Sequence, residues 1–80
     1  MTSIKEHEVV RLLQPAEADI IGEQRIVVLP AGSRGTVQAV WGPATNPVGY
    51  TVEFTLVPLE DYALATVAAD LVESTGEWPR

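Results

Sequence analysis

The chain has 80 residues, of which 46% are hydrophobic, and it carries five Lys and Arg against eleven Asp and Glu, for a formal net charge of -6. This length leaves room for one domain only, and the hydrophobic fraction is typical of a folded protein. The chain has no cysteine, which excludes disulfides, thiolate metal sites and a cysteine nucleophile. The acidic balance argues against nucleic acid and anionic membranes as partners, because both attract basic surfaces.

The expected organisation is a polar lead-in over residues 1–6, one domain over residues 7–75 and a tail over residues 76–80. The N-terminus lacks the apolar run of a secretory signal peptide. The longest apolar stretch, residues 26–32, is far shorter than the roughly 20 residues of a membrane span. We therefore expect no membrane association and a cytoplasmic location.

The first strand is expected within residues 7–13, where Val9 and Val10 favour extended backbone. The mostly polar residues 14–25 are predicted to form a long loop, with one helical turn over residues 16–21. Two adjacent isoleucines in this loop are expected to fold back over one end of the core, because their exposure to water is costly. They are Ile20 and Ile21.

A short extended run over residues 26–29 precedes a Pro- and Gly-containing turn, and an alternating strand follows over residues 36–41. Its alternation places Val37, Ala39 and Trp41 on one face and Thr36, Gln38 and Val40 on the other. Two Pro and two Gly mark residues 42–49 as a loop.

The strictest alternation lies over residues 50–56 and predicts a half-buried strand. A turn is expected over residues 58–61 and a strand over residues 62–67, with a helix as the competing interpretation. One tight helical turn over residues 68–71 and a last short strand over residues 71–73 complete the prediction. Together these elements predict an all-β fold, a small five-stranded SH3-like barrel with a long first loop and one 3-10 turn before the last strand.

Four segments stand out together: His7-Glu8-Val9-Val10-Arg11-Leu12, Leu29-Pro30-Ala31-Gly32-Ser33-Arg34-Gly35-Thr36-Val37, Tyr50-Thr51-Val52-Glu53-Phe54 and Ala69-Asp70-Leu71. In these segments the chain resembles a family of small bacterial domains of unknown function, which is similar to the SH3-like C-terminal domain of the nitrile hydratase beta subunit. The chain departs from the family pattern in its longer excursion over residues 14–28 and in the Thr55-Leu56-Val57-Pro58 run. The resemblance implies a module that packs against a partner, and it implies no catalysis, because the metal-binding cysteines of nitrile hydratase belong to the other subunit.

No catalytic, cofactor-binding or metal-binding residue is predicted. His7, the only histidine, has no neighbours at ligand spacing, and the Glu60-Asp61 pair is typical of a solvated turn. The Gly32-x-x-Gly35 spacing lacks the Lys-Ser/Thr and the helix of a phosphate loop. A catalytic triad of Ser33 with His7 and Asp61 has no nucleophile-elbow context. No small-molecule substrate is evident.

The candidate partner-binding residues are Arg34, Trp41, Tyr50 and Trp78. Arg34 is expected at a turn tip, where it either aids solubility or anchors an interface. Trp41 is expected beside the Pro-rich loop, where it either caps the core or forms a recognition surface. Tyr50 is expected to bury its ring and keep its hydroxyl in water. Trp78 in the tail either packs back or contacts a partner.

These features predict a non-catalytic protein-interaction module, with either a protein partner or a second copy of the chain. The family resemblance adds a narrower form, an antitoxin-like or immunity-like protein that neutralises a partner encoded nearby. One alternative is a structural subunit or accessory protein of a nitrile-hydratase-like metalloenzyme. A second alternative, a KOW-like nucleic-acid module, is opposed by the net charge of -6.

Overall fold

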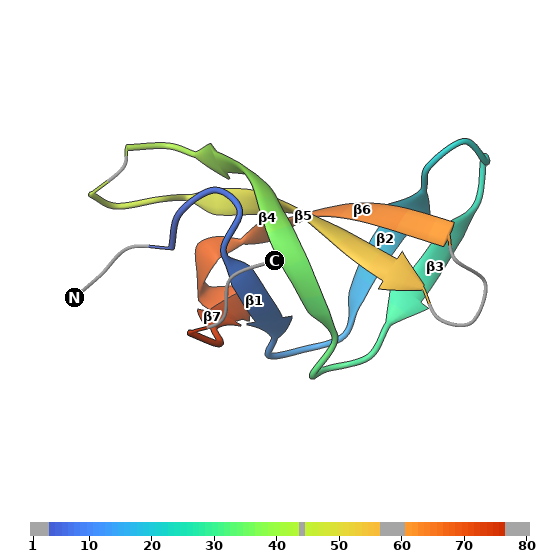
Figure 1. Ribbon diagram of the computed structural model, residues 1–80, viewed down its shortest axis with the longest axis horizontal. Helices are drawn as coiled ribbons and strands as arrows, with labels where there is room; N and C mark the ends of the chain where they lie inside the picture. Colours follow the sequence, from blue (N-terminus) through green and yellow to red (C-terminus); the bar gives the residue numbers. More distant parts are fainter. Residues whose placement is uncertain (1–3, 44, 57–60, 77–80) are drawn as a thin grey trace.

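The computed structural model describes residues 4–43, 45–56 and 61–76, which form seven β-strands and one 3-10 helix (Figure 1). The elements are β1 (Val9–Leu12), β2 (Ala16–Ile20), β3 (Ile26–Leu29), β4 (Arg34–Trp41), β5 (Gly49–Leu56), β6 (Asp61–Ala68), η1 (Ala69–Leu71) and β7 (Val72–Ser74). None of the described residues belongs to a helix with the length and apolar character needed to cross a membrane.

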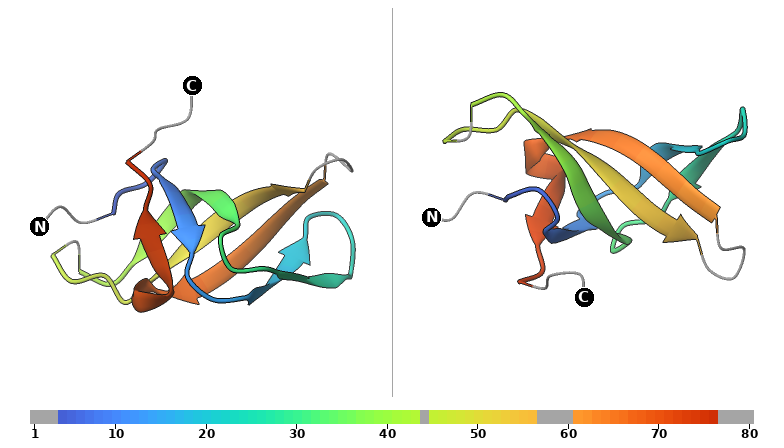
Figure 2. Two further views of the ribbon diagram at one scale, coloured as in Figure 1. Left: turned by 90° about the horizontal axis from the view of Figure 1, so that it is seen from below. Right: turned by 45° about the horizontal axis from the view of Figure 1, so that its top comes forward.

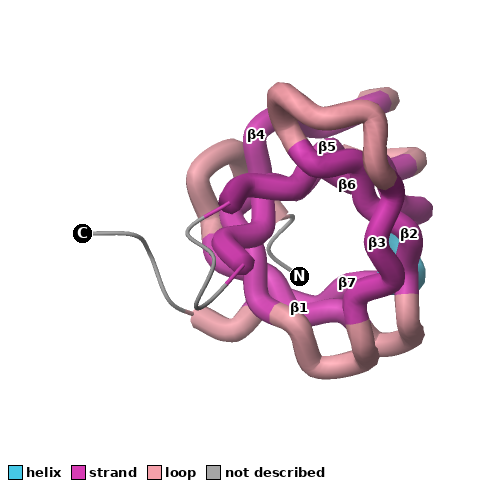
Figure 3. The backbone as a smooth tube through the Cα atoms, turned by 90° about the vertical axis from the view of Figure 1, so that its right-hand side faces the viewer, coloured by secondary structure: helices cyan, strands magenta, loops and turns pink. Residues whose placement is uncertain are grey.

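All strands belong to one antiparallel sheet in the order β3-β2-β6-β5-β4-β1-β7. The sheet is strongly curved, so that the strands are arranged around a common axis (Figure 3). It does not close, because β3 and β7 are its two ends and do not pair with each other. In Figure 1, β3 lies toward the right of the molecule and β7 toward the left.

The all-β prediction is confirmed, and the sheet has seven strands in an open arrangement. The loop predicted over residues 14–25 is wrong over residues 16–20, and so is the helical turn predicted over residues 16–21. Residues 16–20 form β2, which pairs with β3 in a hairpin and with β6 at its far end. The local sequence contains few strand formers, and the pairing partners supplied by the tertiary structure override that weak local preference.

The two adjacent isoleucines of this hairpin have different environments. Ile20 is 2% exposed and belongs to the core, as expected, whereas Ile21 is 49% exposed. Successive side chains of a strand point to opposite faces of the sheet, so the two cannot both enter the core once this segment is extended. The expectation that both isoleucines cover the core is therefore correct for Ile20 only.

The hydrophobic core lies on the concave face of the sheet and includes side chains from all seven strands, with Leu29 as the contribution of β3. Its fully buried members include Val10, Leu12, Val37, Val52, Phe54 and Ala63. The predicted alternation of residues 50–56 is confirmed at Tyr50, Val52 and Phe54, which are 4%, 0% and 2% exposed. The 3-10 turn and the short last strand are also confirmed, at η1 and β7.

A β-bulge in β4 reverses the predicted faces at the end of that strand. Val37 pairs with Val52, but Ala39 pairs with Thr51, so Gln38 is an extra residue on β4. One extra residue turns every later side chain to the other face. Val40 therefore packs against the core and Trp41 lies on the outer, convex face, 53% exposed. The predicted common face of Val37 and Trp41 is wrong for this reason.

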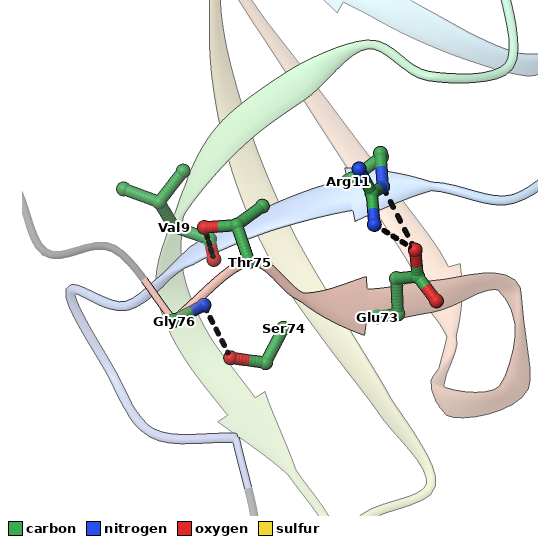
Figure 4. Close-up of polar contacts among 6 residues, drawn as sticks. All are labelled: Val9, Arg11, Glu73, Ser74, Thr75 and Gly76. Atoms are coloured by element: carbon green, nitrogen blue, oxygen red, sulfur yellow. Dashed lines mark hydrogen bonds and ion pairs between the residues drawn. The ribbon is translucent and has the colours of Figure 1, made fainter.

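The seam between β1 and β7 is held by side chains as well as by backbone pairing (Figure 4). Arg11 donates from Nε to Glu73 Oε1 at 2.8 Å and forms an ion pair with the same oxygen through Nη2. Thr75 Oγ1 donates to the Val9 carbonyl at 3.0 Å. His7 lies before this seam in a turn, exposed and with φ of 71°. The first strand therefore begins later than expected.

Candidate functional site

A groove opens between β2 and β6, where the two strands separate from each other. The ladder between these strands pairs Asp19 with Leu64 and Ile20 with Ala63, and it stops there. Figure 1 shows the two strands close together at this end and separating toward the start of β2. The groove left by this separation has a volume of about 640 Å³, which lies within the range of roughly 300–1,000 Å³ typical of ligand pockets.

Apolar and hydroxyl side chains line the groove together. Ile26, from β3, Leu64, from β6, and Leu71, from η1, contribute apolar surface. Thr51 and Thr66, from β5 and β6, contribute hydroxyl groups. This mixture suits a segment that has apolar side chains and also hydrogen-bonding groups.

The same groove carries two carboxylates, from Glu17 and Asp19 on β2. Both residues are exposed, and the two buried residues that alternate with them, Ala18 and Ile20, face the core. The period-two alternation of β2 therefore places both negative charges on the outer face, where they attract a cationic group.

The backbone of β6 also faces this groove. The Tyr62 carbonyl accepts a hydrogen bond from the Ile21 N–H at 2.8 Å. Alternate residues of an antiparallel strand direct their backbone groups to the same side, so Leu64 and Thr66 face β2 as well. Leu64 pairs with Asp19, but Thr66 lies beyond the end of the ladder. The Thr66 backbone is therefore directed toward the groove.

Trp41 is connected to the groove by hydroxyl groups. Its Nε1 donates to Thr51 Oγ1 at 2.8 Å, and Thr51 Oγ1 lies 3.2 Å from Thr66 Oγ1. The indole ring is thus held across β5 beside the two threonines of the groove. Trp41, Thr51 and Thr66, together with Glu17, Asp19 and the rest of the groove, form one continuous surface across β2, β4, β5 and β6. We call this surface the outer-face site.

Of the other predicted partner-binding residues, Arg34 and Tyr50 do not join this site. Arg34 is exposed at the start of β4, and Trp41 ends the same strand, seven residues further along. Tyr50 belongs to the hydrophobic core. Trp78 lies outside the described residues. Their roles in partner binding stay predictions.

Sequence reasoning missed the groove itself. The sequence predicts a loop at Glu17 and Asp19 and a short extended run at Ile26. It predicts a strand at Leu64 and Thr66 but no binding role for either residue. The signal available was the Ala16-Glu17-Ala18-Asp19-Ile20 alternation of polar and apolar residues, which is typical of a half-buried strand.

The described residues offer little else for chemistry. They contain no group of three or more His, Asp or Glu side chains placed to hold a metal ion. Glu8, which is buried, is satisfied by the Lys5 backbone N–H at 3.3 Å and by the Ser74 hydroxyl. The Ser74 contact joins the residue that precedes β1 to β7, and both contacts serve the fold.

Tyr50 gives the fold a dependence on alkaline pH. Burial, and secondarily the negative charge of Glu8, raise the pKa of the Tyr50 phenol above its ordinary value of 10.0. Above the ordinary pKa, the Tyr50 phenol loses its proton in the unfolded chain and retains it in the folded protein. The free energy of unfolding therefore falls as pH rises through about 10. We expect Tyr50→Phe to reduce this fall and Tyr62→Phe, at an exposed tyrosine, to preserve it. Urea unfolding from about pH 8 to about pH 11 measures both, and equal falls in the two variants would contradict the assignment.

Comparison of the chain with protein-family models, with curated proteins and with solved structures gave no match in any of the three. The function proposed below therefore depends on the chemistry of the outer-face site.

Proposed function

We propose that this protein is a non-catalytic protein-interaction module that binds an extended, basic segment of a partner protein in the outer-face site. The observation that supports this most strongly is the end of the β2–β6 ladder, where apolar side chains, two carboxylates and a strand backbone line one groove. Extended peptides bind in this way, through main-chain hydrogen bonds for affinity and side-chain pockets for specificity.

The charge of the site indicates the chemistry of the partner. Glu17 and Asp19 stand on one side of the groove, and the whole chain carries a net charge of -6. A Lys or Arg of the partner gains attraction from both carboxylates, and the overall charge accelerates its encounter with the site. The same charges repel phosphate groups, so nucleic acid is not the partner that we propose.

The apolar side chains of the groove favour a partner segment in which basic and apolar residues alternate. Successive side chains of an extended segment point to opposite sides, so one set faces Ile26 and Leu64 while the other is directed to the rim or to solvent. The indole of Trp41, 53% exposed at the other end of the site, offers a flat apolar surface and attracts cations over its ring.

We also propose that the fold is a variant of the SH3-like arrangement. The strands β1, β4, β5, β6 and β7 follow the expected order of five strands, and η1 precedes the last. The β2–β3 hairpin occupies the long first connection, and its separation from β6 forms the groove. On this interpretation, the longer excursion over residues 14–28 is what forms the binding site.

The test uses short synthetic peptides that alternate lysine with valine or leucine, titrated into 15N-labelled protein. We expect amide shifts to concentrate at Thr51, Leu64 and Thr66. We expect the double variant Glu17→Gln/Asp19→Asn to weaken binding by about tenfold, which corresponds to about 1.4 kcal/mol. Affinity should fall as salt is added, because the attraction is between exposed charges.

The matched control is Glu6→Gln/Glu23→Gln, which removes the same number of charges from exposed positions outside the groove. It should leave affinity within about twofold, a difference of about 0.4 kcal/mol. If both double variants weaken binding equally, the loss of affinity comes from the change in net charge and not from the two carboxylates of the groove. Shifts concentrated away from β2, β5 and β6 would refute the site.

A further inference from the structure

The strand β3 is an edge of the sheet without the features that protect edges. Its sequence is Ile26-Val27-Val28-Leu29, with no charged residue, proline or bulge. Natural sheets usually protect an exposed edge with charges, prolines, bulges or a covering segment. The opposite edge, β7, carries Glu73, which is paired with Arg11, and polar Ser74. The two edges therefore differ in their capacity to add another strand.

The backbone groups on the free side of β3 can be identified from its pairing. The Ile20 N–H donates to the Arg25 carbonyl at 3.0 Å, and Ala18 pairs with Val27 in the same ladder. Backbone direction alternates along a strand, so Arg25 and Val27 face β2. Ile26 and Val28 consequently direct their N–H and C=O groups away from the sheet, where another strand could pair with them.

The side chains of the same two residues are exposed as well. Ile26 and Val28 are 61% and 66% exposed and both lie on the outer face. The hairpin extends to one end of the molecule (Figure 2). The free edge of β3 is thus accessible both through its backbone and through its outer apolar side chains.

We propose that a second copy of this chain pairs with β3 in an antiparallel, two-fold symmetric manner. A two-fold axis at Val27 places Ile26 opposite Val28 of the second copy, and Val28 opposite its Ile26. The outward N–H and C=O groups of these residues then match those of the second copy. The four outer side chains form one apolar cluster. A second copy presents the same edge, so the two-fold arrangement matches every outward donor of one copy with an outward acceptor of the other.

The interface is short, so the dimer belongs to the class of weak, concentration-dependent assemblies. Each copy carries a charge of -6, so added salt screens the repulsion and strengthens the dimer. The proposed binding of a basic peptide has the opposite salt dependence. Val28 does not line the groove, so a change there tests self-association separately from the proposed function.

The test is sedimentation equilibrium of the full chain from micromolar to millimolar concentration, at low and high salt. We expect a reversible dimer, and we expect Val28→Lys to weaken it at least tenfold. This substitution reduces the net negative charge, so charge alone would favour association. The matched control is Val48→Lys, at a residue 70% exposed in the loop between β4 and β5, which should retain the dimer.

Amide exchange gives a second readout. With increasing protein concentration, the N–H groups of Ile26 and Val28 should exchange more slowly, because they form hydrogen bonds in the dimer. A wild-type chain that stays monomeric at every concentration overturns the proposal. A dimer that Val28→Lys leaves intact, or that Val48→Lys weakens equally, also overturns it.

Discussion

Gly35→Ala is expected to remove a large share of the stability of the fold. A Cβ atom built on Gly35 would lie 2.6 Å from Val52 Cγ1, 2.7 Å from the Glu53 carbonyl oxygen and 2.8 Å from Phe54 Cδ1. The Glu53 oxygen belongs to the backbone of a central strand and cannot move without disturbing its pairing with both neighbours. We expect a loss of about 3 kcal/mol or more, a large share of the ~5–15 kcal/mol of a small domain.

A second glycine variant separates this steric effect from general sensitivity to alanine. Gly32 has φ of +90° and nothing within 4 Å of its built Cβ, so Gly32→Ala introduces backbone strain without a clash. Its expected cost is about 1–2 kcal/mol. Urea unfolding of both variants makes the comparison. A Gly35→Ala protein as stable as Gly32→Ala would show that β4 and β5 are less closely packed than in the structure.

Ile20→Ala is expected to destabilise the protein by about 2–5 kcal/mol, because the side chain is fully buried and its removal leaves a cavity. Ile20 is 2% exposed and belongs to the core between β2 and β6. The effect tests the strand assignment of residues 16–20, since it requires the segment to be paired with its side chains in alternation. Loss of Ile20 should also weaken peptide binding, because the adjacent Asp19 would be held less firmly.

The neighbouring residue provides a matched comparison. Ile21→Ala removes the same atoms from a side chain that is 49% exposed, and we expect a cost below about 1 kcal/mol. Thermal unfolding monitored by circular dichroism measures both variants. Similar losses for the two isoleucines would support the earlier expectation that both cover the core, and would contradict the extended conformation of β2.

Local patterns were sufficient where one strand had a consistent period. Residues 50–56 alternate without interruption, and the structure places Tyr50, Val52 and Phe54 in the core. The short 3-10 turn before the last strand was also predictable, because residues 68–71 are too few for a helix of ordinary length and are followed by strand formers. In these segments the local preference and the tertiary packing agree.

The site was less predictable, because it depends on how segments meet. Trp41 was correctly placed at a strand end, but the bulge at Gln38 decides that its ring is on the outer face. Its link to Thr66 requires β4, β5 and β6 to be neighbours. The alternation of Glu17 and Asp19 was present in the sequence, yet nothing in it indicates that the β2–β6 ladder stops at Asp19 and does not reach Glu17.

The sequence by itself determined the all-β class, the main strands, the acidic character and the lack of cysteine chemistry. Each of these depends on residues close together in the chain, or on composition alone. Only the tertiary structure decided the β2–β3 hairpin, the bulge that turns Trp41 outward, the groove and the unprotected edge at β3. These features arise from pairing between strands distant in sequence, whose geometry sets which backbone groups are covered and which face outward.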